Sequence, residues 1–282
     1  MIDRLLRKLL ITLCLSAALC CVAAGVERPV NSSWGLALGS AHTIDTYLTP
    51  LRYSGWGAEL TYRRAQAMKF NPERWSQNVD FGLAFDSMEN PARNASMYYA
   101  GFDASYAMLW RTSLPWGVTA GIGPHLRGDI GVIYLARNGN NPASVKASVT
   151  AGARGYLQRR FTLGRMPVTL RWQSELPVTG AFFSPQYDEL YYEIYLGNHS
   201  GLAHAAWWGN FFRWDNQVMA DLHFSPNALR VGFSQTLLST KVNNITSRRW
   251  GFAFILGVTN DWLTVTPGRA PSAENRKIIF AY

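Results

Sequence analysis

Hydrophobic and polar residues alternate along most of the chain from residue 34 onward. In the longest run, Tyr98, Phe102 and Trp110 occupy one parity, whereas Asp103 and Arg111 occupy the other. Because side chains of a β-strand point alternately to its two faces, this period of two predicts strands with one apolar face and one mixed face. Eleven segments share the pattern, namely residues 34–38, 56–62, 79–85, 98–110, 116–122, 145–151, 168–172, 218–224, 229–233, 250–258 and 278–282.

The last of these segments carries an aromatic residue at its final position. Ile278, Phe280 and Tyr282 share one face of the predicted strand. Such a strand resembles the closing strand of Gram-negative outer-membrane β-barrels. The resemblance implies that this strand pairs with the one beginning at Trp34, that both termini face the periplasm, and that the barrel-assembly machinery recognises the strand ending at Tyr282.

The strand count follows from that arrangement, because a barrel with both termini on one side needs an even number of strands. Residues 262–266, after the Asn260-Asp261 pair, supply a twelfth segment. We therefore predict an all-β fold, a closed antiparallel transmembrane β-barrel of about twelve strands, within a range of about ten to fourteen. Residues 176–217 then form a long outer connection, and a hairpin hidden within it would raise the count to fourteen.

A soluble β-sandwich also alternates, with its polar face in water. Charged residues make up only 16% of this chain, against about 25% in soluble domains. Aromatic residues reach 13%, and Trp110, Trp116 and Trp250 lie near predicted strand ends, where interfacial girdles form. The segments 96–111 and 116–134 exceed the roughly 9–11 residues of a transmembrane strand. These features favour the membrane barrel.

The N-terminus has the pattern of a secretory signal peptide. Arg4, Arg7 and Lys8 precede a short apolar run at 9–19, and small residues at 22–25 offer a cleavage site. A genuine membrane helix is the alternative interpretation, but the run is short. We expect residues 1–25 to be removed, which leaves a barrel domain of residues 26–282 in the outer membrane of a Gram-negative bacterium.

The three cysteines, Cys14, Cys20 and Cys21, all lie within the expected signal peptide. The mature chain would then have no disulfide, thiolate metal site or cysteine nucleophile. It would carry 24 basic and 17 acidic residues, a net charge of +7. The basic residues are scattered, so we expect no nucleic-acid partner; the expected partners are outer-membrane lipid and lipopolysaccharide.

Charged residues at the mixed parity predict a network inside the barrel. His125, Arg127 and Asp129 alternate along one segment and would point into the lumen. Buried charges must be paired, so an ion-pair network is the favoured interpretation, with a proton relay as the alternative. A metal held by His125 and His223 has no supporting ligand spacing, and we expect neither a metal nor a cofactor. The predicted network comprises Arg63, Asp80, Asp103, Arg111, His125, Arg127, Asp129, Arg171, Glu175, Asp221, His223 and Arg230.

Residues 178–215 are the least regular part of the chain. They would form either a folded surface loop that presents aromatic side chains to a ligand or a barrel hairpin anchored by interfacial aromatics. Residues 188–196 fit a helix or a strand.

The His-Ser pair in this region raises the possibility of an outer-membrane lipid hydrolase of the phospholipase or lipid A deacylase type. His199 and Ser200 are adjacent, so a strand would point them to opposite faces. Ser200 and His204 share a face but would lie ~13 Å apart. A loop could bring them together, so His125, His199, Ser200 and His204 are the candidate catalytic residues of this alternative.

The chain also resembles a family of Bacteroidetes outer-membrane proteins of unknown function. The resemblance is densest in Phe182-Phe183-Ser184-Pro185-Gln186-Tyr187 and continues from Glu193 to Gly201. It implies a location and a fold but transfers no catalytic residue. We therefore predict a non-enzymatic outer-membrane barrel that works as a narrow, porin-like pore or as a structural or binding protein of the cell surface.

Overall fold

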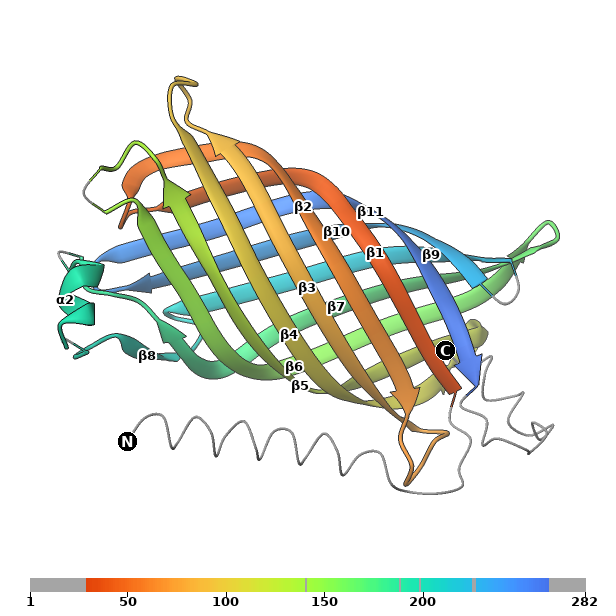
Figure 1. Cartoon of the computed structure of the whole chain (residues 1–282). Helices are drawn as coiled ribbons and strands as arrows, with labels where there is room; N and C mark the ends of the chain where they lie inside the picture. Colours follow the sequence, from red (N-terminus) through yellow and green to blue (C-terminus); the bar gives the residue numbers. More distant parts are fainter. Residues whose placement is uncertain (1–28, 140, 188, 198, 225–226, 264–282) are drawn as a thin grey trace.

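The computed structural model describes residues 29–263, except 140, 188, 198 and 225–226. Within these residues, ten antiparallel strands close into a barrel, with β1 paired to both β2 and β11 (Figure 1). The strands are β1 (Pro29–Asp45), β2 (Thr49–Ala67), β3 (Trp75–Glu89), β4 (Ser96–Leu114), β5 (Val118–Leu135), β6 (Ala143–Leu163), β7 (Met166–Phe183), β9 (Phe211–Phe224), β10 (Asn227–Val242) and β11 (Ile245–Leu263). The predicted closed antiparallel barrel is confirmed.

Three short elements complete the described chain. The 3-10 turn η1 (Pro115–Gly117) joins β4 to β5, while the helix α2 (Tyr191–Tyr195) and the strand β8 (Ala203–Ala206) lie between β7 and β9. The helix expected as one alternative within 188–196 is therefore present, and β8 pairs only with the end of β7. No helix among the described residues is long and apolar enough to cross a membrane.

The predicted count of about twelve strands is wrong, because the described barrel closes with ten. Trp34 pairs with Val258 of β11, and Pro29 pairs with Leu263. Both edges of β1 are thus occupied, so the expected pairing of the Trp34 strand with residues 278–282 is also wrong. β11 runs straight through the Asn260-Asp261 pair, which was expected to be a turn. Residues 264–266 and 278–282 lie outside the described residues.

The two ends of the barrel differ. Pro29 and Leu263 meet at one end, which we call the terminal end, together with η1 and the turn between β6 and β7. The opposite end, the loop end, holds the longest connection, residues 184–210. It also holds a two-residue connection between β10 and β11, where Asn243 and Asn244 both adopt positive φ. Two asparagines with positive φ are typical of a two-residue hairpin turn.

The outward face of the barrel is apolar over a continuous band. Rings of neighbouring strands touch along one row of this band, with centroid separations of 4.9 Å for Trp34–Tyr62, 6.5 Å for Tyr62–Phe81 and 6.3 Å for Phe81–Phe102. On β4 the outward aromatic positions extend from Tyr98 to Trp110, twelve residues apart. That separation is roughly 40 Å along the strand, or roughly 28 Å along the axis of a barrel whose strands tilt by about 45°.

The inward-facing side chains are short on one side of the barrel and long on the other. β1, β2 and β11 contribute mostly small residues besides Glu59, Arg63 and Arg249, and the other long side chains of the lumen come mainly from β5, β6, β7 and β9. A Cβ atom on Gly57 would lie only 2.4 Å from Asp86 Oδ1, and one on Gly82 only 2.6 Å from Asp103 Oδ1. Small residues at these positions thus let charged side chains cross the narrow interior, in which the strand number leaves little free space.

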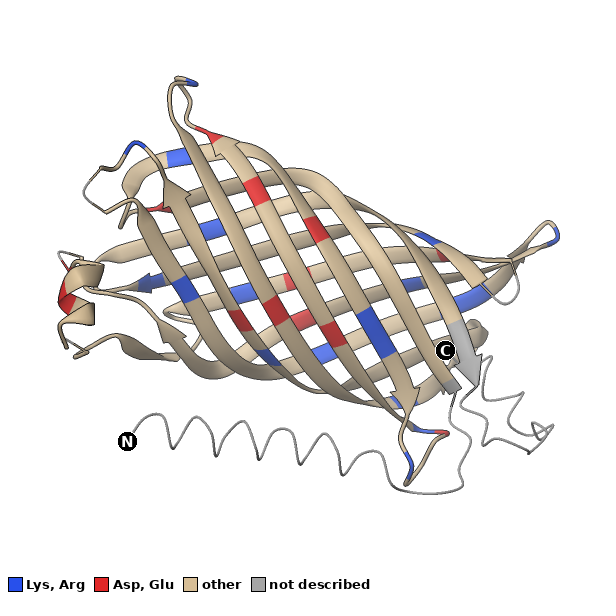
Figure 2. Ribbon diagram, viewed as in Figure 1, with Lys and Arg blue, Asp and Glu red and all other residues tan. Residues whose placement is uncertain are grey.

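Apolar side chains fill parts of the lumen near the loop end. One buried cluster comprises Ala41, Leu48, Tyr53, Met88, Met97, Ile133 and Leu135. A second cluster, on the opposite wall, comprises Phe182, Ala206 and Phe211, with Leu238 and Val242 packed against it. Many of the charged positions of the strands lie along the middle of the barrel, between these clusters and the terminal end (Figure 2).

Candidate functional site

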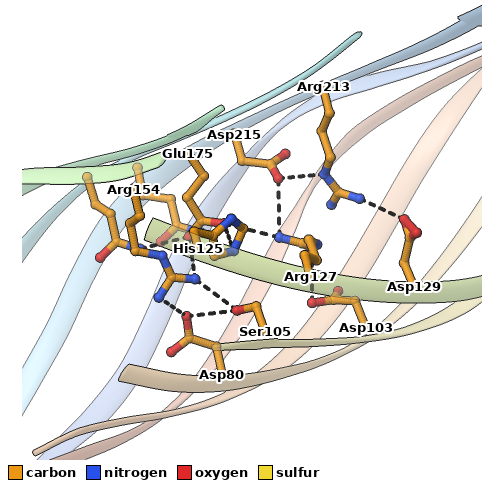
Figure 3. Close-up of polar contacts among 12 residues, drawn as sticks. Asp80, Asp103, Ser105, His125, Arg127, Asp129, Arg154, Glu175, Arg213 and Asp215 are labelled. Carbon is orange, nitrogen blue, oxygen red and sulfur yellow. Dashed lines mark hydrogen bonds and ion pairs between the residues drawn. The ribbon is translucent and has the colours of Figure 1, made fainter. Parts of the chain in front are cut away.

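The centre of the lumen is crossed by a layer of ion pairs built around Glu175 of β7 and Arg127 of β5 (Figure 3). Arg127 Nη1 lies 3.3 Å from Glu175 Oε2 and 3.3 Å from Asp215 Oδ2, and its Nη2 lies 2.9 Å from Asp103 Oδ2. His125 Nε2 is 3.3 Å from the same Glu175 oxygen. One arginine therefore joins carboxylates from three strands across the barrel.

The layer continues toward the terminal end through Arg154 of β6. Its Nη2 lies 2.8 Å from Glu175 Oε1 and donates to Ser105 Oγ at 2.8 Å, while its Nη1 lies 2.6 Å from Asp80 Oδ2. The Arg154 side chain is 1% exposed. A guanidinium so deeply buried needs its carboxylate partners, because a buried charge without a partner is strongly destabilising.

Toward the loop end, the layer continues through Arg213 of β9. Its Nε lies 2.7 Å from Asp215 Oδ2, and its Nη1 lies 3.0 Å from Asp129 Oδ1, an acid that also accepts a hydrogen bond from Ser148. The three arginines and their acids thus form one connected network (Figure 3). We call it the central ion-pair layer and define it as Asp80, Asp103, His125, Arg127, Asp129, Arg154, Glu175, Arg213 and Asp215.

Further polar contacts fill the lumen between this layer and the terminal end. Arg230 holds Asp221 with two hydrogen bonds, 2.7 Å from Nε and 2.8 Å from Nη2, and donates to Ser33 Oγ at 2.9 Å. Arg171 lies over the Tyr156 ring, 4.1 Å from its centroid. A bidentate guanidinium–carboxylate pair has a defined geometry, so Arg230 and Asp221 hold each other in fixed positions in this half of the lumen.

The structure places all twelve residues of the predicted network at inward positions. Asp80, Asp103, His125, Arg127, Asp129 and Glu175 lie in the central ion-pair layer, and Asp221 pairs with Arg230. The remaining four make other contacts: Arg63 donates to Gln217, Arg171 to Gln173, Arg111 to the carbonyls of Pro72 and Glu73, and His223 bonds Thr169.

Sequence reasoning missed three members of the layer, Arg154, Arg213 and Asp215. Arg154 lies beyond the predicted segment, which ended at residue 151. It nevertheless continues the series of alternate residues that face the lumen. Arg213 and Asp215 fall in the stretch judged least regular, where β9 in fact begins at Phe211. Extending these two alternating segments by three to five residues would have found all of them.

A cavity lies between the central ion-pair layer and the loop end. Its volume is about 1250 Å³, counting the part that is open to solvent. Phe182, Phe211 and Leu238 form an apolar wall on one side, whereas charged residues of the layer and Lys146 line other sides. Lys146 Nζ is bound to the fully buried Asp45, at 2.6 Å from Oδ2. The cavity is therefore amphipathic.

The loop end is tied together by tyrosine hydrogen bonds. Tyr191 of α2 accepts a hydrogen bond from the backbone N–H of Val145 at 2.6 Å, and Tyr47 donates to the carbonyl of Glu189 at 2.7 Å. The two rings meet edge to face. Burial raises the pKa of the Tyr47 hydroxyl and that of the Tyr191 hydroxyl above their ordinary values. Both rings therefore anchor α2 in their neutral form.

The structure does not bring together the candidate catalytic residues of the hydrolase alternative. His125 lies in the central layer, while His199 and Ser200 are exposed in the connection after α2. His204 Nε2 contacts the carbonyl of Ser184 at 3.1 Å. Among the described residues, no hydrogen bond joins a serine hydroxyl to any of these three histidines. The proton acceptor that a serine nucleophile needs is thus not in place.

Fold and site define a ten-stranded antiparallel β-barrel with an apolar outer face and a charged, largely filled lumen. The chain belongs to the family described as "Protein of unknown function (DUF3316)", whose model matches residues 7–269. The Bacteroidetes origin stays a prediction. No curated protein matches the sequence.

Solved structures with a similar fold have little sequence in common with this chain. Neisserial surface protein A is 11% identical with a TM-score of 0.33. The aligned region covers 83% of this chain and 97% of the chain of that protein. The outer membrane protease OmpT from Escherichia coli is 9% identical with a TM-score of 0.48, at 84% and 97% coverage. The translocator domain of the autotransporter NalP from Neisseria meningitidis is 9% identical with a TM-score of 0.39, at 92% and 95% coverage.

Proposed function

We propose that this protein is an integral outer-membrane β-barrel that is closed to through-flow, non-enzymatic, and active in binding rather than conduction. The observation that carries the proposal is the pairing of an apolar outer band with a lumen crossed by the central ion-pair layer. The first feature supports a lipid environment, and the second supports a closed barrel.

The outer band supports membrane insertion because it exposes large apolar side chains on every barrel strand. Leu83, for example, is 57% exposed at the middle of β3. Burying such a side chain is worth about 1.5–3 kcal/mol, and soluble monomers rarely expose contiguous apolar patches of this kind. Polar residues flank the band, as Arg52 and Arg64 do on β2, on either side of Trp56 and Tyr62.

The kind of membrane follows from the architecture. Closed barrels leave no unpaired strand edge in lipid, and single-chain barrels with an even number of strands are typical of the bacterial outer membrane. The ten-stranded count and the shared terminal end of β1 and β11 fit that class. The signal peptide expected at residues 1–25 would bring the chain to this compartment.

The lumen supports binding over conduction. The central ion-pair layer joins β3, β4, β5, β6, β7 and β9 by direct contacts, and Arg230, Asp221 and Arg171 occupy the lumen beyond it. A hydrated ion would have to displace several charge-assisted hydrogen bonds in order to pass. In a planar-bilayer recording of the folded protein, we expect no conductance steps. Stable steps of uniform size in the wild type would contradict the closed lumen.

Membrane insertion is tested by a matched pair of substitutions on β3. Leu83→Arg places a charge in the middle of the outer band, and Ser87→Arg places one at its edge, where Ser87 pairs with Trp56. In lipid the first should lower the free energy of unfolding by about 2–4 kcal/mol, and the second by about 0–1 kcal/mol. Denaturant titration in phospholipid vesicles measures both. Equal, small effects would indicate a barrel that folds in water.

Lipid hydrolysis is the alternative raised by the sequence, and no contact among the described residues favours it. Wild type and the His125→Ala, His199→Ala and His204→Ala variants would be incubated with phospholipid and lipopolysaccharide. We expect no turnover above that of empty vesicles. Turnover by the wild type that a single His→Ala substitution abolishes would overturn the non-enzymatic assignment.

A further inference from the structure

Among the described strands, the longest insertion into the barrel wall lies between β7 and β9. The β7–β9 ladder ends at the pair Glu175↔Asp215, and the β7–β8 ladder begins at Gly180↔Ala206. From Glu175 to Gly180 β7 advances five residues, whereas the opposite chain moves nine residues, from Asp215 to Ala206. Antiparallel pairing requires equal steps. Four residues, 207–210, are therefore inserted into what would otherwise be one continuous strand.

The insertion is held in a defined conformation by hydrogen bonds within it. Asn210 Oδ1 accepts from the Trp207 N–H at 3.0 Å, and Asn210 Nδ2 donates to the Ala205 carbonyl at 2.8 Å. The Trp207 carbonyl accepts from the Phe211 N–H at 2.8 Å. A Cβ atom on Gly209 would lie 2.0 Å from the Trp207 ring, so this ring folds back directly over the glycine. Backbone groups of the insertion thus find hydrogen-bond partners locally, without pairing to β7.

Side chains close the wall where the ladder is missing. Inside, the rings of Phe182 on β7 and Phe211 on β9 pack with centroids 5.4 Å apart. Outside, Trp208 Nε1 donates to the carbonyl of Pro177 at 2.6 Å, and Pro177 itself has no N–H to pair. Side chains change rotamer far more readily than a paired strand separates, so this is the most easily opened part of the described wall.

The interruption lies directly beside the cavity and near the edge of the outer band. Phe182, Phe211 and Leu238 are both the inner face of the interruption and the apolar wall of the cavity. On the outside, Trp207 and Trp208 are more than half exposed. Tryptophan is enriched at the level of the lipid headgroups. A molecule held at the membrane interface would therefore meet this place in the wall first.

We propose that the β7–β9 interruption is a lateral entrance through which a single-chain amphiphile with an anionic head group passes from the membrane into the cavity. The inference rests on the membrane insertion proposed above. The apolar wall would take the chain. The head group would meet Arg213 and Lys146. Arg213 lies two positions after Phe211 on β9. Lys146 lies two positions before Ser148, which is the ladder partner of Phe182.

Both cations have donors left for such a head group. Lys146 contacts Asp45 through one of its three N–H groups. Arg213 contacts Asp215 and Asp129 through Nε and Nη1, and among the described residues no contact uses its Nη2. Guanidinium and ammonium groups are the donors that a carboxylate or phosphate prefers. The cavity thus combines an apolar wall with two cations that keep free donors, among charged groups of both signs.

Ligand class is tested with 11-(dansylamino)undecanoic acid as a fluorescent probe, on the full chain folded in phosphatidylcholine vesicles. We expect saturable binding that palmitate displaces and that hexadecyltrimethylammonium does not. Leu238→Trp fills the cavity and should raise the probe Kd at least tenfold. The matched control Leu237→Trp changes the neighbouring outward residue of β10 and should leave it within twofold. Absence of saturable binding, or equal effects of the two variants, would overturn the site, and displacement by the cation would overturn the head-group class.

The route is tested by blocking the wall from outside. In a background with Cys14, Cys20 and Cys21 replaced by serine, Val178→Cys lies at the interruption and Val218→Cys at a paired position of β9. Their native valines are 50% and 46% exposed, respectively. A bulky maleimide on Val178→Cys should slow probe uptake at least fivefold, whereas the same label on Val218→Cys should not. Equal uptake rates would overturn the lateral route.

A deletion of residues 207–210 gives an independent check on the route, since it removes the four inserted residues and leaves equal numbers of residues between the flanking pairs on both sides. Uptake by this variant should also slow at least fivefold, and an unchanged rate would count against the entrance. Gel migration of unheated and boiled samples reports folding in every case. A folded, membrane-inserted wild type without probe binding would defeat this inference alone, whereas a chain that stays soluble would defeat the proposed function as well.

Discussion

The two halves of the lumen are built on opposite principles. Between the central ion-pair layer and the terminal end, long charged side chains occupy the interior, and Arg230 donates hydrogen bonds to Asp221 and Ser33. Between the layer and the loop end, the interior holds a cavity lined by Phe182, Phe211 and charged groups. This barrel therefore fills the half of the lumen near the terminal end with polar contacts and leaves a cavity in the half near the loop end.

The largest expected effect comes from the layer that separates the halves. Glu175→Ala would leave Arg127 and Arg154 without a shared carboxylate and should lower the free energy of unfolding by about 3–5 kcal/mol. Asp103→Ala removes an acid that contacts only Arg127 and is more exposed, 17% against 9%, so its effect should be smaller. Urea titration in detergent micelles measures both. Equal losses would show that the layer is not centred on Glu175.

The ion pair of Arg230 in the terminal half and that of Arg249 in the loop half differ in exposure and in geometry. Arg230 is 9% exposed and holds Asp221 with two short bonds, whereas Arg249 is 22% exposed beside the cavity and holds Asp86 at 2.7 and 3.4 Å. Arg230→Ala should lower the free energy of unfolding by about 3 kcal/mol, and Arg249→Ala by about half as much. The reverse order in the same titration would contradict a more tightly packed terminal half.

Glycine substitutions test free space directly. A Cβ atom on Gly121 would lie 2.1 Å from the ring of Tyr156, and one on Gly101 would lie 2.1 Å from the hydroxyl of Tyr99. Gly121→Ala should cost about 1–3 kcal/mol, as overpacking does in a filled interior. Tyr99 borders the cavity and has room to move, so Gly101→Ala should cost less. Thermal unfolding of both variants decides the comparison, and a costlier Gly101→Ala would argue against usable space.

The smallest effect concerns the loop end at high pH. Burial raises the pKa of the Tyr47 and Tyr191 hydroxyls above the ordinary value of 10.0. The folded state holds these protons more tightly than the unfolded state, so this contribution is complete below pH 10 and is lost as pH rises above it. Proteolysis of the 184–210 connection should therefore accelerate above pH 10 in the wild type. Tyr191→Phe should cleave faster at pH 8 and show a weaker pH dependence.

Alternation along the chain predicted most of the wall. Ten of the eleven alternating segments fall within the ten strands, apart from Trp116 and Gly117, which form part of η1. The strand count went wrong at the C-terminal side, because a period of two defines the faces of a strand and not its neighbours. Asn260 and Asp261 look like a turn in sequence, but ladder pairing to β1 and β10 carries β11 through this region.

The candidate site was only partly readable in the sequence. Alternation identified Arg127 and Glu175 as inward-facing, but not that Arg127 contacts both Glu175 and Asp215 of β9. Their partners are 48 and 88 residues away along the chain. The interruption at residues 207–210 could not be recognised either, since an insertion exists only relative to the register of the opposite strand.

The printed residues alone were thus enough for the all-β class, the two faces of each strand and the charged character of the interior, because a side chain's face depends only on local parity. Closure through β1 and β11, the joining of nine residues into one ion-pair layer, the cavity and the break in the wall all depend on pairing between distant strands. Register and neighbour choice are set by the free energy of the whole closed sheet, so only the tertiary structure could reveal them.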